Sequence, residues 1–162
     1  TFTAEELWGA LPPFDGKASS VHLTQLPEPQ TDPDDAALGE RWKTLIALKG
    51  EIAKAVEIAR QNKVVGHSLD AAVALALPET LRALVEGARE ELQALSIVSR
   101  LDVVEPGAMD APYASEEFPG LVIGVSKATG GKCNRCWMFS ETVGSRTGHP
   151  TLCERCYRSL ES

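Results

Sequence analysis

The fold of the C-terminal part of this chain is decided by two stretches, Lys132-Cys133-Asn134-Arg135-Cys136-Trp137 and Leu152-Cys153-Glu154-Arg155-Cys156-Tyr157. Each contains a Cys-x-x-Cys pair. Two residues between cysteines let both thiolates of one turn face a single ion about 2.3 Å away, and two such turns close a shell of four sulfurs. The spacing predicts one structural Zn(II) per chain, held by Cys133, Cys136, Cys153 and Cys156. A closed shell leaves no position for a water, so we expect no catalytic residue here.

Other uses of these cysteines remain open at the level of spacing. A rubredoxin-like iron site has the same ligands and spacing, and two disulfides or a redox dithiol are further alternatives. His149, four residues before Cys153, can also replace a thiolate. However, residues 1–132 contain no cysteine, whereas a disulfide framework staples a small fold throughout its length. A metal-binding free energy on the order of 10–16 kcal/mol is sufficient to fold so small a module.

The two pairs repeat their surroundings, because each reads Cys-x-Arg-Cys followed by an aromatic residue. This repeat is typical of the two knuckles of a zinc ribbon. Between them, we expect residues 137–152 to form a hairpin with Gly144 and Gly148 in its turns.

The charge of the chain changes sign near its end. The whole chain has 16 Lys and Arg against 23 Asp and Glu, a net charge of -7, which excludes a generic polybasic binder of nucleic acid or membrane surfaces. Residues 126–162 instead carry an excess of basic side chains, and such a tip can contact phosphates. The candidate nucleic-acid-binding residues are Lys132, Arg135, Trp137, Arg155 and Arg158. As alternatives, the two knuckle arginines donate to groups around the metal, and the tryptophan covers it.

Upstream of the cysteines, hydrophobic periodicity predicts a small α+β layer. Asp32-Pro33 opens a long helix whose apolar stripe includes Trp42 and Ile52, with Glu51 on its polar face. Strict alternation predicts a strand over residues 69–77, although the alanine content leaves a helix open. A helix over 78–95, a strand over 97–104, an acidic loop over 107–119 and a strand over 121–125 follow. We therefore expect a small sheet with helices on one face, followed by the C-terminal zinc ribbon.

The N-terminal residues predict a short helix and a connector. Thr3-Ala4-Glu5-Glu6 matches a capping box, Pro12-Pro13 stops the helix, and residues 13–33 are rich in Pro, Asp and Ser. The helix is either the end of a helical unit or a helix packed on this same domain. Because neither an 18-residue apolar run nor a secretory signal is visible, we expect a cytoplasmic protein without membrane contact.

The knuckles, together with His149-Pro150, resemble the C-terminal zinc finger of bacterial isoleucyl-tRNA synthetase, a finger type shared with formamidopyrimidine-DNA glycosylases. The upstream chain is similar to the same synthetase family over nearly its whole length. The matching stretches are Ala4-Glu5-Glu6-Leu7-Trp8, Ser20-Val21-His22-Leu23, Ala59-Arg60-Gln61-Asn62-Lys63-Val64-Val65-Gly66-His67-Ser68-Leu69-Asp70-Ala71 and Val125-Ser126-Lys127. The long match over residues 59–71 favours the ligase over the glycosylase.

This resemblance implies the C-terminal region of a class I aminoacyl-tRNA synthetase that helps to hold isoleucine tRNA near its anticodon stem-loop. It implies three parts: the end of the anticodon-binding helical bundle with a connector (1–33), the α+β domain (34–127) and the zinc ribbon (128–162). The family's adenylate-forming signatures have no match here, so ATP-dependent aminoacylation belongs to domains outside this sequence. The expected partners are isoleucine tRNA and the rest of the synthetase chain, in a monomer. A zinc-stabilised protein interaction module without nucleic-acid contact is the alternative.

Overall fold

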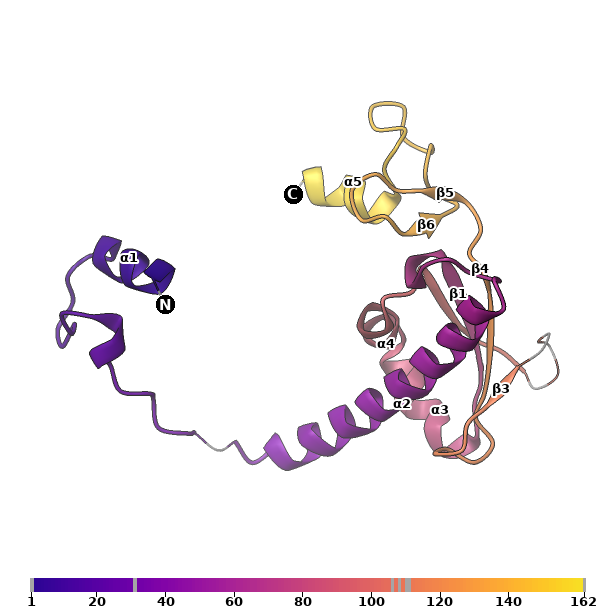
Figure 1. Ribbon diagram of the computed structural model, residues 1–162, viewed down its shortest axis with the longest axis horizontal. Helices are drawn as coiled ribbons and strands as arrows, with labels where there is room; N and C mark the ends of the chain where they lie inside the picture. The colour runs from indigo at the N-terminus through magenta and orange to yellow at the C-terminus, as the bar shows by residue number, and fades with distance from the viewer. Residues whose placement is uncertain (1, 31, 106, 108, 110–111, 162) are drawn as a thin grey trace. The chain divides into compact units, whose positions relative to one another are not determined.

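The computed structural model describes residues 2–30, 32–105, 107, 109 and 112–161 (Figure 1). Contacts divide the chain into two compact units, Thr1–Ala36 and Ala37–Ser162. The elements in chain order are α1 (Phe2–Ala10), η1 (Val21–Leu23), α2 (Asp35–Gln61), η2 (Ser68–Asp70), β1 (Ala71–Ala76), α3 (Glu79–Gly87), α4 (Arg89–Ser96), β2 (Arg100–Val103), β3 (Tyr113–Ala114), β4 (Val122–Lys127), β5 (Gly131–Lys132), β6 (Phe139–Ser140) and α5 (Glu154–Glu161).

The first unit is held by polar contacts and one aromatic pair. The Glu5 carboxylate accepts hydrogen bonds from the Ser20 hydroxyl at 2.9 Å and the Val21 amide at 3.1 Å. The Trp8 indole packs edge-on against Phe14, with ring centroids 5.7 Å apart. The predicted capping box is wrong, because α1 begins at Phe2 and Thr3 therefore lies inside the helix.

Helix α2 supplies one wall of the main core. The helix begins at Asp35, after the predicted Asp32-Pro33 start, and Asp32 still contacts its first turn: its carboxylate accepts from the Asp34 amide at 2.9 Å and its own amide donates to the Asp35 carboxylate at 2.9 Å. The helix buries the stripe Leu45, Leu48, Ile52, Ala55, Val56 and Ala59. The assignment of Glu51 to the polar face is wrong, because this side chain is fully buried.

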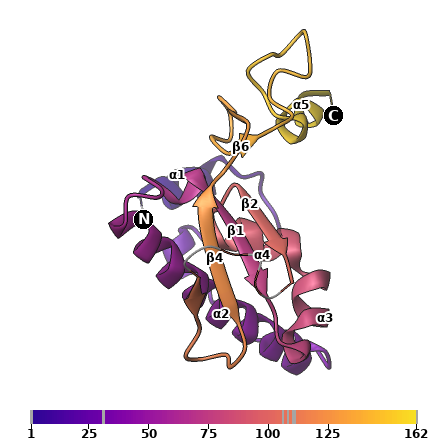
Figure 2. The same cartoon turned by 90° about the vertical axis from the view of Figure 1, so that its right-hand side faces the viewer.

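A four-stranded mixed sheet in the order β2-β1-β4-β3 forms the centre of the second unit (Figure 2). Strand β1 pairs in parallel with β2 and antiparallel with β4. The predicted alternation is confirmed, because Ala71, Val73 and Leu75 are buried while Ala72 and Ala74 are only half-buried. The buried side chains of β1 share one core with side chains of α2, α3 and α4, so the helices cover one face of the sheet.

The crossover between β1 and β2 differs from the prediction. One helix was expected over residues 78–95, but the structure has two, α3 and α4, that meet at Ala88. Ala88 leaves the helical region with φ -129° and ψ 21°, directly after Gly87. The break lets both short helices place buried side chains, Val85 and Leu92, in the same core.

The expected acidic loop contains a short strand, β3, whose Tyr113 pairs with Ile123 at the edge of the sheet. After β4, the chain enters the cysteine-containing residues, which have a second, separate core around Cys133, Cys153 and Cys156. Among the helices that the structure describes, none combines the length and apolar character that crossing a bilayer requires.

Candidate metal centre and its basic surroundings

The four cysteines converge on one point. Their sulfur atoms all lie within 4.8 Å of one another, and Cys136 Sγ is 3.8 Å from Cys153 Sγ. A tetrahedral zinc site with Zn–S distances of about 2.3 Å requires sulfur separations of about 3.8 Å. All four cysteines are free thiols, which disfavours the disulfide alternative. The donor set, its spacing and its burial therefore fit one structural Zn(II).

The two knuckles repeat one backbone interaction and then diverge. The residue after each pair donates its amide to the carbonyl of the first cysteine: Trp137 to Cys133 at 2.8 Å, and Tyr157 to Cys153 at 3.0 Å. The first knuckle connects strands β5 and β6, whereas the second knuckle opens helix α5. The predicted hairpin over residues 137–152 is wrong, because the paired strands flank the first knuckle instead.

The surroundings of the four sulfurs favour the thiolate form of Cys133. Burial raises the pKa of Cys133, but the backbone amides of Cys136, Cys153 and Arg135 outweigh it and lower the pKa to about 6. Burial and neighbouring sulfurs raise the pKa of Cys153 to about 12. A coordinated Zn(II) deprotonates the thiols that bind it. In the ribbon, the metal would cross-link the two knuckles.

Two of the five candidate nucleic-acid-binding residues also contact groups of the ribbon itself. Arg135 and Arg155 are engaged within the ribbon: an Arg135 Nη donates to the Cys156 carbonyl at 3.4 Å, and an Arg155 Nη lies 3.4 Å from Met138 Sδ. All five candidate residues are exposed, these two arginines included, and Trp137 keeps 59% of its surface accessible. Trp137 has a positive φ of 65°, which turns the chain after the first knuckle.

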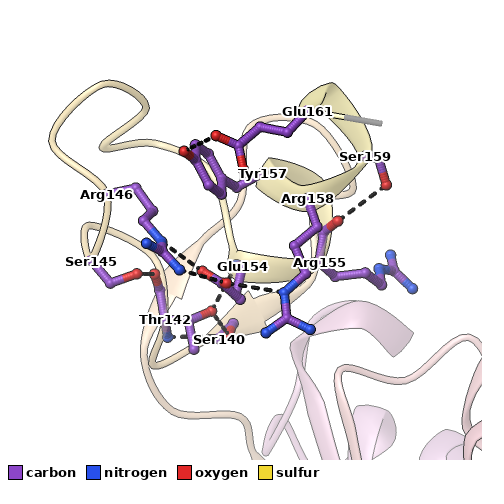
Figure 3. A network of polar contacts seen from close by, with 10 residues as sticks. All are labelled: Ser140, Thr142, Ser145, Arg146, Glu154, Arg155, Tyr157, Arg158, Ser159 and Glu161. Atoms are coloured by element: carbon purple, nitrogen blue, oxygen red, sulfur yellow. Dashed lines mark hydrogen bonds and ion pairs between the residues drawn. The ribbon is translucent and has the colours of Figure 1, made fainter.

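A network that the sequence did not reveal surrounds Glu154 (Figure 3). Its carboxylate accepts two hydrogen bonds from Arg146, at 2.9 and 2.8 Å, and one from Arg158 at 3.1 Å. These donors hold the pKa of Glu154 at about 2. The Arg158 pair follows helical i,i+4 spacing, but Arg146 lies in an irregular segment eight residues before Glu154, where periodicity gives no signal.

A groove of about 960 Å³ lies between the ribbon and the α+β layer of the same unit. Arg155 and Arg158 line its ribbon side, and Glu90 and Ile97 line its layer side. The groove therefore combines charged rims with apolar surface.

Comparison with known proteins agrees with this geometry. Residues 130–158 match the family described as the zinc finger found in FPG and IleRS. The chain is 47% identical over 161 residues to an isoleucine–tRNA ligase of Geobacter sulfurreducens, 44% identical over 158 residues to one of Moorella thermoacetica, and 42% identical over 162 residues to one of Syntrophotalea carbinolica.

These matches cover 96–99% of this chain but only 17% of each ligase, so the chain spans about one sixth of the length of these relatives. The similarity extends well beyond the finger, which accounts for residues 130–158 alone. The chain is therefore similar to one part of isoleucine–tRNA ligases, and its residues 130–158 match the zinc finger found in FPG and IleRS.

Proposed function

We propose that this chain is the C-terminal region of an isoleucine–tRNA ligase and that it helps to hold isoleucine tRNA near the anticodon stem-loop. Cys133, Cys136, Cys153 and Cys156 hold one Zn(II), which folds the ribbon and takes no part in chemistry. ATP-dependent aminoacylation is carried out by domains outside this chain. The proposal is carried by one observation: a four-sulfur cluster within 4.8 Å in a chain matched to these ligases over nearly its whole length.

The ribbon offers the chemistry that RNA contact requires. Lys132 and Arg158 are exposed cations, and Trp137 is an exposed aromatic surface on which a base can stack. Arg135 and Arg155 are exposed too, but an Nη of each is engaged within the ribbon, whereas Arg158 is engaged through Nε alone, so we assign the more direct phosphate contacts to Lys132 and Arg158. Residues 1–125 carry an excess of acidic side chains, so they would not compete with the ribbon for phosphate.

A second candidate function is a zinc-stabilised interaction module that packs on the rest of the synthetase and does not touch RNA. The engagement of Arg135 and Arg155 within the ribbon favours it, because two of the five candidate residues then serve the ribbon itself. An interface of this kind depends mainly on apolar burial and responds little to added salt, whereas phosphate contacts weaken as salt rises.

The test titrates the full-length synthetase that contains this region with isoleucine tRNA and with a non-cognate tRNA at two salt concentrations. We expect Lys132→Ala and Arg158→Ala to weaken tRNA binding by roughly 1–3 kcal/mol each and to reduce the salt slope by about one unit. Amino-acid activation without tRNA should not change. If zinc-containing variants of Lys132, Trp137 and Arg158 all bind tRNA as the parent does, the interaction module is the correct function.

A further inference from the structure

We propose that Arg146 and Arg158 form a paired binding site for one phosphodiester group and that Glu154 is the positioning residue that holds the pair together. The inference rests on the proposed RNA-binding role of the ribbon. It adds to that role a residue, Arg146, that the basic patch read from the sequence did not include. It also adds Glu154, an acidic residue that strengthens RNA binding although its own negative charge repels phosphate.

The geometry leaves donors free on both arginines (Figure 3). Arg146 uses Nε and one Nη for the two oxygens of Glu154, and Arg158 uses only Nε. A guanidinium carries five N–H donors, so each arginine keeps Nη donors that have no hydrogen-bond partner in the described part of the chain. The side chain of Glu154 is only 23% exposed, whereas those of Arg146 and Arg158 are 48% and 77% exposed.

Three contacts hold the pair in place. The Glu154 amide donates to Thr142 Oγ1 at 3.0 Å, which fixes the start of α5 against the irregular segment that carries Arg146. The Tyr157 ring lies under the Arg146 guanidinium, 4.9 Å from its centroid. The Glu154 carboxylate lies between two cations that would otherwise repel each other and separate.

A phosphodiester is the ligand that this arrangement fits. Guanidinium groups bind phosphate oxygens through forked hydrogen bonds, and two of them held on one carboxylate suit a group with two unesterified oxygens. The three charged groups together carry a net charge of +1, which matches the single negative charge of a phosphodiester. Arg158 and Glu154 also line the groove between the ribbon and the α+β layer.

The decisive experiment asks whether Glu154→Gln weakens or strengthens tRNA binding. Glu154→Gln removes a negative charge, so a general electrostatic attraction for RNA predicts tighter binding. Loss of positioning predicts weaker binding, because the arginines separate. In the full-length synthetase, we expect Glu154→Gln to weaken isoleucine tRNA binding several-fold and to reduce the salt slope, and Arg146→Ala to weaken binding by about tenfold.

Glu141→Gln is the matched control, because it removes the same charge from an exposed ribbon residue whose carboxylate contacts Thr129 and neither arginine. It should leave tRNA binding unchanged or slightly tighter. If Glu154→Gln behaves as Glu141→Gln does, or if Arg146→Ala binds as the parent does, the paired site is wrong. In either case, weaker tRNA binding by Lys132→Ala or Trp137→Ala would still support the proposed function. Failure of the paired site is therefore distinguishable from failure of the proposed function.

Glu154 follows a candidate metal ligand, so the zinc content of each variant must be measured. If Glu154→Gln loses zinc, Arg146→Lys decides the question. Lysine keeps the charge but cannot form the two-pronged contact with Glu154. We then expect weaker tRNA binding with a normal zinc content, and binding equal to that of the parent would overturn the proposal.

Discussion

The hydroxyl of Ser99 accepts a 2.7 Å hydrogen bond from the backbone amide of Phe139 and donates to the carbonyl of Leu69. Ser99 lies just before strand β2, and Phe139 begins strand β6 of the ribbon. A single buried side chain, 7% exposed, therefore joins the α+β layer to the ribbon. Both residues also line the groove between the ribbon and the layer.

Removal of this hydroxyl should loosen the ribbon without unfolding it. Ser99→Ala leaves the Phe139 amide and the Leu69 carbonyl without this partner, and we expect a loss of about 1–3 kcal/mol in the free energy of unfolding. Hydrogen exchange of the Phe139 amide should accelerate while zinc content stays normal. Ser96→Ala is the control, because the buried Ser96 hydroxyl has no partner among the described residues and its removal should cost little. Equal effects of the two variants would contradict the role of Ser99.

Glu51 predicts a dependence of stability on pH. Burial raises the pKa of this carboxyl group, but hydrogen bonds from Lys54, Ser115 and Tyr113 outweigh it, so the pKa lies below its usual 4.5. Because the pKa is depressed in the folded state, this stabilisation is present above pH 4.5 and is lost as the pH falls through the folded-state pKa.

Tyr113→Phe tests this dependence, because it removes a 3.1 Å hydrogen bond to Glu51 and keeps the ring. We expect the free energy of unfolding in urea to fall by about 1–2 kcal/mol at pH 7, and this difference from the parent should shrink below pH 4.5. Tyr157→Phe is the control, because its hydroxyl contacts the exposed Glu161. A deficit that stayed constant down to pH 3 would show that the hydroxyl stabilises the fold independently of Glu51 ionisation.

Local patterns in the sequence predicted the parts of the fold that local physics controls. The alternation at Val73 and Leu75 predicted a strand because the side chains of a half-buried strand alternate between its faces. The predicted single zinc is confirmed by the clustered sulfurs and the family match, since the spacing within each pair already fixes how two ligands meet one ion.

Contacts between distant residues account for what the sequence did not predict. Its charge predicts that Glu51 lies on the polar face of the helix, but Tyr113, 62 residues away, pairs with it in the interior. Strand β3 has only two residues and exists through its pairing with β4, so no periodicity marks it. The ribbon hairpin was misplaced for a similar reason: glycines at 144 and 148 mark turns, but the strand partners Lys132 and Phe139 are set by closure of the first knuckle.

Gly130 should be essential to this hairpin. Its φ is +90°, and a Cβ atom there would lie 2.3 Å from the backbone carbon of Ser140, which cannot move away as a flexible side chain does. We expect Gly130→Ala to separate strands β5 and β6 and to weaken zinc binding. Gly148→Ala is the control, because a Cβ there meets nothing within 4 Å. Competition with a chromogenic zinc chelator measures the affinity, and equal values for both variants would show that the hairpin tolerates the strain.

Loss of one zinc ligand should unfold the ribbon and spare the layer. The layer core is built from α2, α3, α4 and the sheet, whereas the ribbon core contains the cysteines and few other side chains. Because metal binding on the order of 10–16 kcal/mol holds such a small module together, Cys153→Ser should release zinc and expose the ribbon amides to rapid exchange. The amides of β1 should stay protected, since their partners lie in β2 and β4.

Elemental analysis and hydrogen exchange measure the two outcomes, and chelation of the parent protein should reproduce both without a mutation. The layer should lose only the small contribution of the contact between Ser99 and Phe139, about 1–3 kcal/mol. If the β1 amides lost protection together with those of the ribbon, the layer would depend on the metal for its own fold. If Cys153→Ser kept a full zinc content, the assignment of the four ligands would be wrong.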